Sequence, residues 1–220
     1  MKYINFLIKS FAAGVMIAIG GTVFLMVENV VIGAMLFSIG LFVIVSNELS
    51  LFTGKVGYIF ENKLNYLFEL LITILGNFLG TFVTALCLLQ TRLATKLHTK
   101  ASALTFCKLS DSTISIFILS IFCGTLMFLA VNGHKFLKSS LGKYLSIFLC
   151  VSVFILSGFE HCVANMFYFS VSESLSVKSL LYLTYMILGN SVGAILFALL
   201  EKFCLRLQKN KHPVSYTHLR

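Results

Sequence analysis

Six long stretches without Asp, Glu, Lys or Arg constrain what this chain can fold into. They cover residues 10–27, 29–47, 70–91, 112–133, 144–159 and 179–200. A helix needs about 20 residues to cross roughly 30 Å of hydrocarbon, and these stretches approach or reach that length. Charged residues make up only 11% of the chain, against about 25% in soluble domains, so polar residues could not cover a water-soluble fold. The sequence therefore predicts an all-α membrane protein with six transmembrane helices.

The second and fifth stretches end differently from the other four. Each is followed by an ionisable residue and then by a shorter apolar extension. Glu48 precedes an extension that ends at Phe60, and Glu160 with His161 precedes residues 162–171. Backbone can leave helical geometry at membrane depth only where protein or a water-filled cavity satisfies its polar groups. We therefore expect two broken helices around a functional site.

The two interruptions occupy matching places in two halves of the chain, about residues 1–90 and 110–203. Three matched pairs, 110 to 113 residues apart, define the halves: Gly76-Asn77 with Gly189-Asn190, Glu48 with Glu160, and Gly14 with Gly124. Three spans in each half make the second half inverted relative to the first. Interrupted segments in two inverted halves indicate a transport site near the middle of the membrane. For the repeated Gly-Asn pairs themselves we expect helix packing, with Asn bonding between helices.

Positive charges are distributed unequally between the segments that join the spans. If the N-terminus is cytoplasmic, 12 of the 17 Lys and Arg residues face the cytoplasm and 5 face outward. Because cytoplasmic loops carry excess Lys and Arg, this places both termini in the cytoplasm. The net charge of +9 is then a topology signal, and no nucleic-acid partner is expected. Four of the five outer charges, including Lys108, lie between spans three and four, either as a solvated loop or as a vestibule that concentrates anions.

The segment around the second interruption resembles a known family. Residues 158–167 read Gly-Phe-Glu-His-Cys-Val-Ala-Asn-Met-Phe, which resembles the hallmark motif of the formate/nitrite transporter family. Residues 37–54 resemble its second span and the loop that breaks it. The resemblance covers about residues 8–203. It implies an aquaporin-like protomer with its own pore, assembled into a homopentamer that conducts formate, nitrite or hydrosulfide.

The resemblance also implies roles for single side chains. His161 would be the central pore histidine, Thr53 the hydroxyl bonded to it, and Lys108 the lysine that draws anions inward. One constriction, on the cytoplasmic side, would be formed by Phe37, Leu41 and Phe154, and one on the outer side by Leu51, Phe52 and Met127. Structural roles would fall to Glu48, Glu160, Asn165, Gly76, Asn77, Gly189 and Asn190.

Each role has a simpler alternative. His161 could join two helices by a hydrogen bond without touching substrate. Thr53 could cap the helix that follows the break, and Lys108 could be an ordinary loop charge. These alternatives stay open at the level of sequence.

Two features depart from the family pattern. Gly124 stands where many members carry a pore asparagine, so a polar contact to the anion would be missing. The chain starts about nine residues before its first span, so a longer N-terminal segment that gates some members would be absent or truncated. In the cytoplasmic tail, residues 204–220, the last seven residues (214–220) resemble translated sequencing adapter and are set aside.

The predicted function is a passive or proton-linked channel for small monovalent anions in the cytoplasmic membrane. A proton-coupled carrier with alternating access is the alternative within transport. A membrane enzyme using Glu160 and His161, with His134 or Cys123, is the alternative from another class. Adjacent residues point to different helix faces, and no i, i+4 pair of His or Cys ligands exists, so we predict no metal and no cofactor.

Overall fold

Helices account for almost all of the computed structural model, which describes residues 2–211, with side chains for residues 3–207. The order is α1 Lys2–Met26, α2 Val30–Phe37, α3 Ile39–Ser46, α4 Phe52–Lys55, the 3₁₀ helix η1 Val56–Glu61, α5 Asn65–Leu89, α6 Ala94–Ser110, α7 Thr113–Phe136, α8 Ser140–Leu156, α9 Cys162–Val171 and α10 Val177–Lys211. The suspected adapter segment, residues 214–220, lies outside the described residues.

Four helices, α1, α5, α7 and α10, are long and apolar enough to cross a membrane unaided. The other two predicted crossings are composite. The first consists of α2 and α3 followed by α4 and η1, and the second of α8 followed by α9. Both interruptions fall where the sequence predicted them. The helix stops just before Glu48 in the first half and just before Glu160 in the second, and a short helix follows each break. The all-α membrane architecture is confirmed.

The two halves repeat the same helix contacts. Helix α1 packs along α5 in the first half, and α7 packs along α10 in the second. A Cβ atom added to Gly14 would overlap the carbonyl oxygen of Asn77, and one added to Gly124 would overlap that of Asn190. Gly124 therefore packs against the backbone of α10, and this packing leaves no room for an asparagine side chain in this chain.

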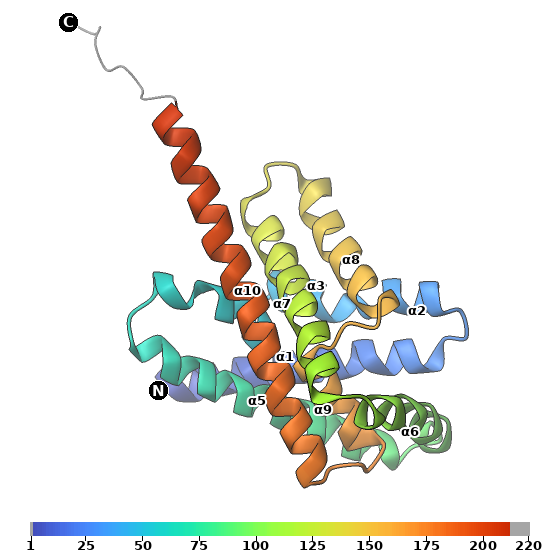
Figure 1. The fold of residues 1–220 in the computed structure, drawn as a ribbon. Helices are drawn as coiled ribbons and strands as arrows, with labels where there is room; N and C mark the ends of the chain where they lie inside the picture. The colour runs from blue at the N-terminus through green and yellow to red at the C-terminus, as the bar shows by residue number, and fades with distance from the viewer. Residues whose placement is uncertain (1, 212–220) are drawn as a thin grey trace, which may run out of the picture.

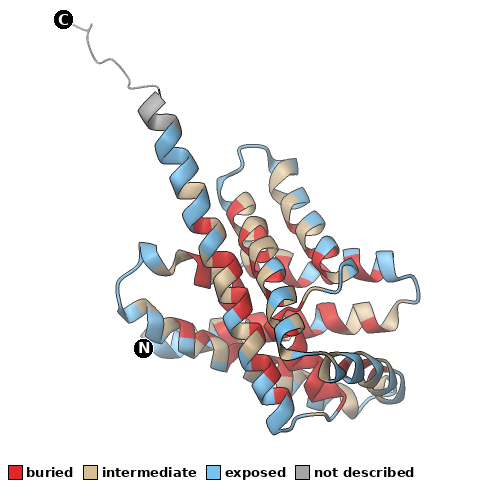
Figure 2. Ribbon diagram, viewed as in Figure 1, coloured by how far each residue is buried: buried red, intermediate tan, exposed pale blue. Residues whose placement is uncertain are grey.

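The buried core lies where the elements cross, and exposed residues gather on the periphery and on the end of α10 (Figure 2). Every residue of α9 is buried, although the helix is only 10 residues long. It therefore lies in the interior of the bundle, surrounded by α1, α5, α6 and α10. Such complete burial suits a broken helix whose ends must be satisfied by protein.

Two sides of the bundle can be distinguished (Figure 1). The start of α1 and the end of α10 lie on one side, here called the terminal side, where Lys202 pairs with Glu61 at 3.0 Å. Helix α6 lies on the opposite side, here called the α6 side, where Lys96 pairs with Glu28 at 2.8 Å. The sequence did not predict α6, since its segment was interpreted as a loop. It also did not predict the break at Ser38 that separates α2 from α3.

Candidate functional site

Asn77 fixes the first interruption. Its amide oxygen accepts a hydrogen bond from the backbone N–H of Phe52 at 3.0 Å, at the first residue of α4. Its amide nitrogen donates to the carbonyl oxygens of Ser10 and Ser50, at 2.8 and 2.9 Å. One buried side chain thus ties α5 to α1 and to the loop that leads into the broken helix. It supplies partners that this non-helical backbone cannot find in lipid.

Asn190 repeats this arrangement at the second interruption. Its oxygen accepts from the N–H of Cys162 at 2.9 Å, at the first residue of α9. Its nitrogen donates to the carbonyl oxygens of Ser120 and Glu160, both at 2.8 Å. The two asparagines therefore do more than the helix packing expected from sequence, because each binds the loop of a broken helix as well as a neighbouring helix.

These contacts show which residues correspond between the halves. Ser50 and Glu160 each offer a carbonyl to the matched asparagine, so Ser50 is the counterpart of Glu160. Glu48 corresponds instead to Gly158, and both have left-handed backbone, with φ of 51° and 69°. The predicted correspondence of Glu48 with Glu160 is wrong. Backbone geometry is repeated at the two turns, whereas the side chains there differ.

His161 and Thr53 meet where the two broken helices approach each other. The Nε2 atom of His161 lies 2.9 Å from the Thr53 hydroxyl oxygen, and both residues are buried. The Nδ1 atom of His161 accepts from the backbone N–H of Ala164 at 3.1 Å, so the ring also caps the N-terminus of α9. A neutral imidazole has one donor and one acceptor nitrogen. Because Nδ1 accepts, Nε2 carries the hydrogen and donates to Thr53.

Two aromatic rings lie against this histidine. The Phe154 ring stacks on the His161 ring, with centroids 5.6 Å apart and planes 25° apart. The Phe37 ring meets Phe154 edge-on at 5.9 Å. Both phenylalanines are buried. The polar pair is therefore covered by an apolar layer, which excludes water from one side of the imidazole.

Lys108 reaches the same region from the end of α6. Its Nζ atom lies 2.7 and 2.6 Å from the two carboxylate oxygens of Glu160, and its side chain is only 16% exposed. Asn165 donates to Glu160 at 2.8 Å and to the His161 carbonyl at 3.0 Å. Glu160, the residue just before the central histidine, thus neutralises the charge of Lys108. The side-chain oxygen of Asn165 is buried and has no donor within the described residues.

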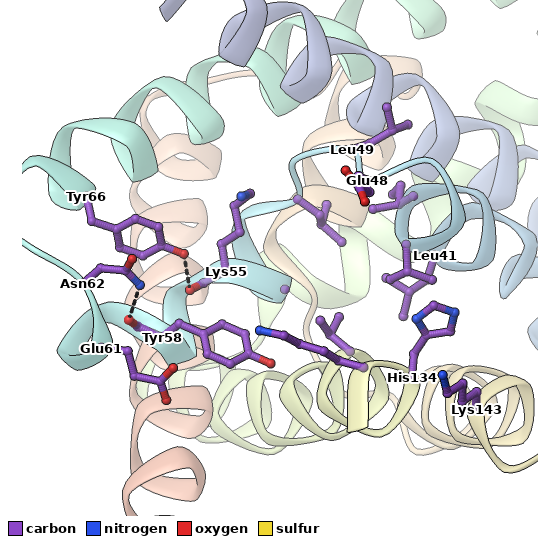
Figure 3. A pocket seen from close by; sticks show the side chains of 16 residues that line it. Leu41, Glu48, Leu49, Lys55, Tyr58, Glu61, Asn62, Tyr66, His134 and Lys143 are labelled. Carbon is purple, nitrogen blue, oxygen red and sulfur yellow. Dashed lines mark hydrogen bonds between the residues drawn. The ribbon is translucent and has the colours of Figure 1, made fainter. Parts of the chain in front are cut away.

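Two cavities flank the centre. The smaller, of about 90 Å³, lies on the α6 side, and its lining includes Phe24, Leu104, Lys108, Phe154, His161, Asn165 and Tyr168. The larger, of about 740 Å³, lies on the terminal side (Figure 3). Its lining includes Leu41, Glu48, Leu51, Lys55, Tyr58, Tyr66, His134 and Lys143. A buried polar pair between two cavities on opposite sides has the arrangement of a pore interrupted at its middle.

A family model described as formate/nitrite transporter matches residues 1–203. The chain belongs to the formate/nitrite transporter family. It is therefore a multi-pass membrane transport protein and not an enzyme, so family membership excludes the alternative based on Glu160 and His161 as catalytic groups.

Individual relatives agree with this assignment. A formate-nitrite transporter from Plasmodium falciparum (isolate 3D7) is 27% identical over 186 residues, which are 74% of this chain. The chain spans 60% of the length of that relative. Two solved structures share the fold at 23% identity. A pentameric formate channel with formate bound gives a TM-score of 0.81 over 94% of this chain and 98% of its own, and an FNT family ion channel gives 0.79 over 92% and 90%.

The predicted grouping of the constriction residues in this family member needs correction. Leu41 and Leu51 were assigned to opposite constrictions, yet both line the terminal-side cavity. Phe154 was grouped with Leu41, yet it lines the α6-side cavity and contacts Phe37. The reason is that the α2–α3 segment and α8 belong to inverted halves, so Leu41 in α3 lies toward the terminal side and Phe154 near the end of α8 lies toward the α6 side. Three of the six residues are buried outside both linings: Phe37, Phe52 and Met127.

Several residues near the centre carried no sequence signal. Phe24 and Tyr168 line the α6-side cavity, although both read as ordinary core residues in the sequence. Tyr58 and Tyr66 line the terminal-side cavity, and Tyr66 donates to the Lys55 carbonyl at 2.9 Å. The short extension that contains Tyr58 could have suggested its place, because it directly follows the first interruption.

Proposed function

We propose that this protein is a channel for small monovalent anions, with formate or nitrite as first candidates and hydrosulfide as the second. The observation that carries the proposal is the buried hydrogen bond between His161 and Thr53. It joins the two broken helices at the point where the flanking cavities end. The formate bound in one structural relative supports the substrate class.

An anion that reaches this point must leave water. Burying a polar or ionised group without compensation costs several kcal/mol. The rings of Phe37 and Phe154 raise this barrier, and the polar pair lowers it by offering hydrogen bonds. The N-terminus of α9 at His161 adds the positive end of a helix dipole. The combination favours a small anion over water and over cations.

We propose that His161 acts mainly as a hydrogen-bond donor. Its Nε2–H donates to Thr53, which leaves the Thr53 hydroxyl hydrogen free to be donated to the permeating species. Protonation at Nδ1 would break the cap on the Ala164 N–H. The anion would therefore take its proton from water on the entry side and pass the apolar layer as the neutral acid. Flux should rise as the pH on that side falls.

The decisive test is formate flux into proteoliposomes, measured for wild type, His161→Phe and the matched control His134→Phe. His134 lines the terminal-side cavity and lies outside the central pair. The proposal predicts that His161→Phe loses at least tenfold of the flux at every pH, while His134→Phe retains the wild-type flux. Equal flux in His161→Phe and wild type at every pH would overturn the role of His161.

A carrier with alternating access is distinguished by the same preparation. A channel shows resolvable unitary conductance or flux that does not saturate at high formate concentration. Saturating flux with exchange acceleration would indicate the carrier instead.

Assembly and orientation belong to the same proposal. Exposed apolar side chains follow α2 and α8, including Val31, Met35, Leu145 and Leu149, and provide a face for lipid or a neighbouring protomer. We propose a homopentamer, as in the structural relative. Native mass spectrometry in detergent should give five copies, and a monomer as the sole species would contradict it.

We propose that both termini are cytoplasmic. Cys107 on α6 and Cys204 near the end of α10 are both exposed and lie on opposite sides. Cys87, near the end of α5, is exposed as well, so the test uses a Cys87→Ser background. A membrane-impermeant maleimide added to intact cells should label this background and its Cys204→Ser variant equally, and should lose that labelling in its Cys107→Ser variant. The reverse pattern would place the termini outside.

A further inference from the structure

The terminal-side cavity carries its own set of charges. Three lysines line it, Lys55, Lys135 and Lys143, together with two carboxylates, Glu48 and Glu61. Glu61 is already paired with Lys202 at 3.0 Å, on a helix that does not line the cavity. Positive charge therefore exceeds negative charge in this cavity, which is the condition for concentrating anions.

Lys55 is the lysine of this set that lies nearest in sequence to the central pair. It ends the four-residue helix α4, two residues after Thr53. Tyr66 donates a hydrogen bond to its carbonyl oxygen at 2.9 Å, which fixes the backbone. Figure 3 shows its side chain rising from α4 between Tyr66 on one side and Glu48 on the other. The residue is half-buried, so its charge is screened less than that of a surface lysine.

Within residues 3–207, no carboxylate forms a salt bridge with Lys55, although the Glu69 carboxylate attracts its ammonium group from beyond salt-bridge distance and Lys9 repels it. Its Nζ atom lies 4.9 Å from the centre of the Phe6 ring, a contact that holds the ammonium without cancelling its charge. Lys108 differs, because Glu160 binds it through both oxygens. The centre thus has a cation in a salt bridge on the α6 side and a cation without a salt bridge on the terminal side.

We infer that Lys55 is an anion-binding residue that holds small monovalent anions in the terminal-side cavity before they pass the Thr53–His161 contact. This inference rests on the proposed channel function. It adds a binding step to that function, because anions in the terminal-side cavity meet a cation without a salt bridge, whereas those in the α6-side cavity meet an ion pair. Replacing Lys55 should therefore lower the permeability in both directions.

The test compares Lys55→Met, Lys55→Arg and the control Lys63→Met in vesicles of known orientation. Lys63 is an exposed lysine on the same side that does not line the cavity. Lys63→Met therefore removes the same single positive charge as Lys55→Met, but outside the cavity. Formate flux is measured at concentrations well below saturation, in each direction separately. Size-exclusion profiles check that all variants assemble like the wild type.

The inference predicts that Lys55→Met lowers flux in both directions about threefold to tenfold, as expected for a lost focusing charge. The two directions should fall by the same factor, because the permeability of a passive channel below saturation does not depend on direction. Lys55→Arg should restore the flux, and Lys63→Met should match wild type. Raising the salt concentration should reduce the difference between wild type and Lys55→Met.

Two results would separate the possible failures. If wild type conducts formate and Lys55→Met matches Lys63→Met in both directions, the role of Lys55 is refuted and the channel function stands. If wild-type vesicles conduct none of formate, nitrite or hydrosulfide above empty liposomes, the proposed function itself fails. If Lys55→Met does not assemble, Lys55→Gln replaces it and the same comparison applies.

Discussion

Replacing Asn77 or Asn190 by Leu tests whether these two residues hold the broken helices. Leu has nearly the same size as Asn but can neither donate nor accept a hydrogen bond. Each replacement removes three buried hydrogen bonds, one to an N–H and two to carbonyl oxygens. Because the two sets match in number, partner type and burial, the two variants should lose stability by similar amounts.

The magnitude follows from the same contacts. Hydrogen bonds between helices in membrane proteins contribute about 0.6 kcal/mol on average and about 1.7 kcal/mol at most. Three of them give a loss of about 2–5 kcal/mol per variant. The unpaired N–H of Phe52 or Cys162 moves the value toward the upper end, because an unsatisfied buried donor is costly.

The assay is reversible unfolding in mixed detergent micelles, followed by circular dichroism. Asn47→Leu is the matched control, since Asn47 is exposed and its amide bonds only to the Val43 carbonyl in its own helix. The reasoning would be refuted if either core variant lost no more stability than Asn47→Leu. A large loss in one core variant and none in the other would contradict the twofold correspondence.

Two further predictions concern packing and pH. Gly124→Ala should lower the free energy of unfolding by about 1–3 kcal/mol, because the added Cβ overlaps the backbone of α10. Gly142→Ala is the control and should be tolerated, since the nearest atoms to its added Cβ lie 3.6 Å away. Equal stability of the two variants would contradict the packing. Lys96 and Lys100 hydrogen-bond to the Glu28 carboxylate and hold its pKa below its ordinary value of 4.5. A lowered folded-state pKa contributes stability above the unfolded pKa, and that contribution is lost as pH falls through the folded pKa. Melting temperatures of wild type and Glu28→Gln should therefore differ above pH 4.5 and converge at lower pH, and a difference that grows on acidification would refute this assignment.

The composite spans show how much of the fold can be predicted from sequence. Hydropathy located all six crossings, because the cost of placing a segment in lipid depends mainly on its composition. The positions of Glu48 and Glu160 located both interruptions for the same reason. Helix α6 escaped this reasoning, since its polar composition is equally typical of a loop. The break at Ser38 also escaped it, because no proline or charge marks the position.

The centre of the site was harder to predict than the fold. The sequence showed that the two halves repeat, but not which residues correspond at the two interruptions. Asn77 and Asn190 are 113 residues apart, whereas Ser50 and Glu160 are 110 apart, so the connection between the broken helix and the last span is three residues longer in the second half. Side-chain identity misled here, because a serine and a glutamate take the same backbone role.

Lys108 illustrates the same limit for charge. Its approach to the pore was predicted from the family resemblance, and the structure places it beside the α6-side cavity. Its pairing with Glu160 was not predicted, since the two residues lie 52 positions apart on segments that only the fold brings together. No functional role was predicted for Lys55 for a related reason. It interrupts an apolar segment of the sequence, and only the fold shows that it lines the terminal-side cavity.

The central claim is that Thr53 and His161 act as one unit on the permeating anion. A double-mutant cycle of formate flux tests it most directly, with Thr53→Val, His161→Phe and the double variant measured at one pH. If the two side chains act through their 2.9 Å contact, the double variant should lose no more flux than the worse single variant, a coupling of about 1–3 kcal/mol. Losses that simply add on a logarithmic scale would contradict the account.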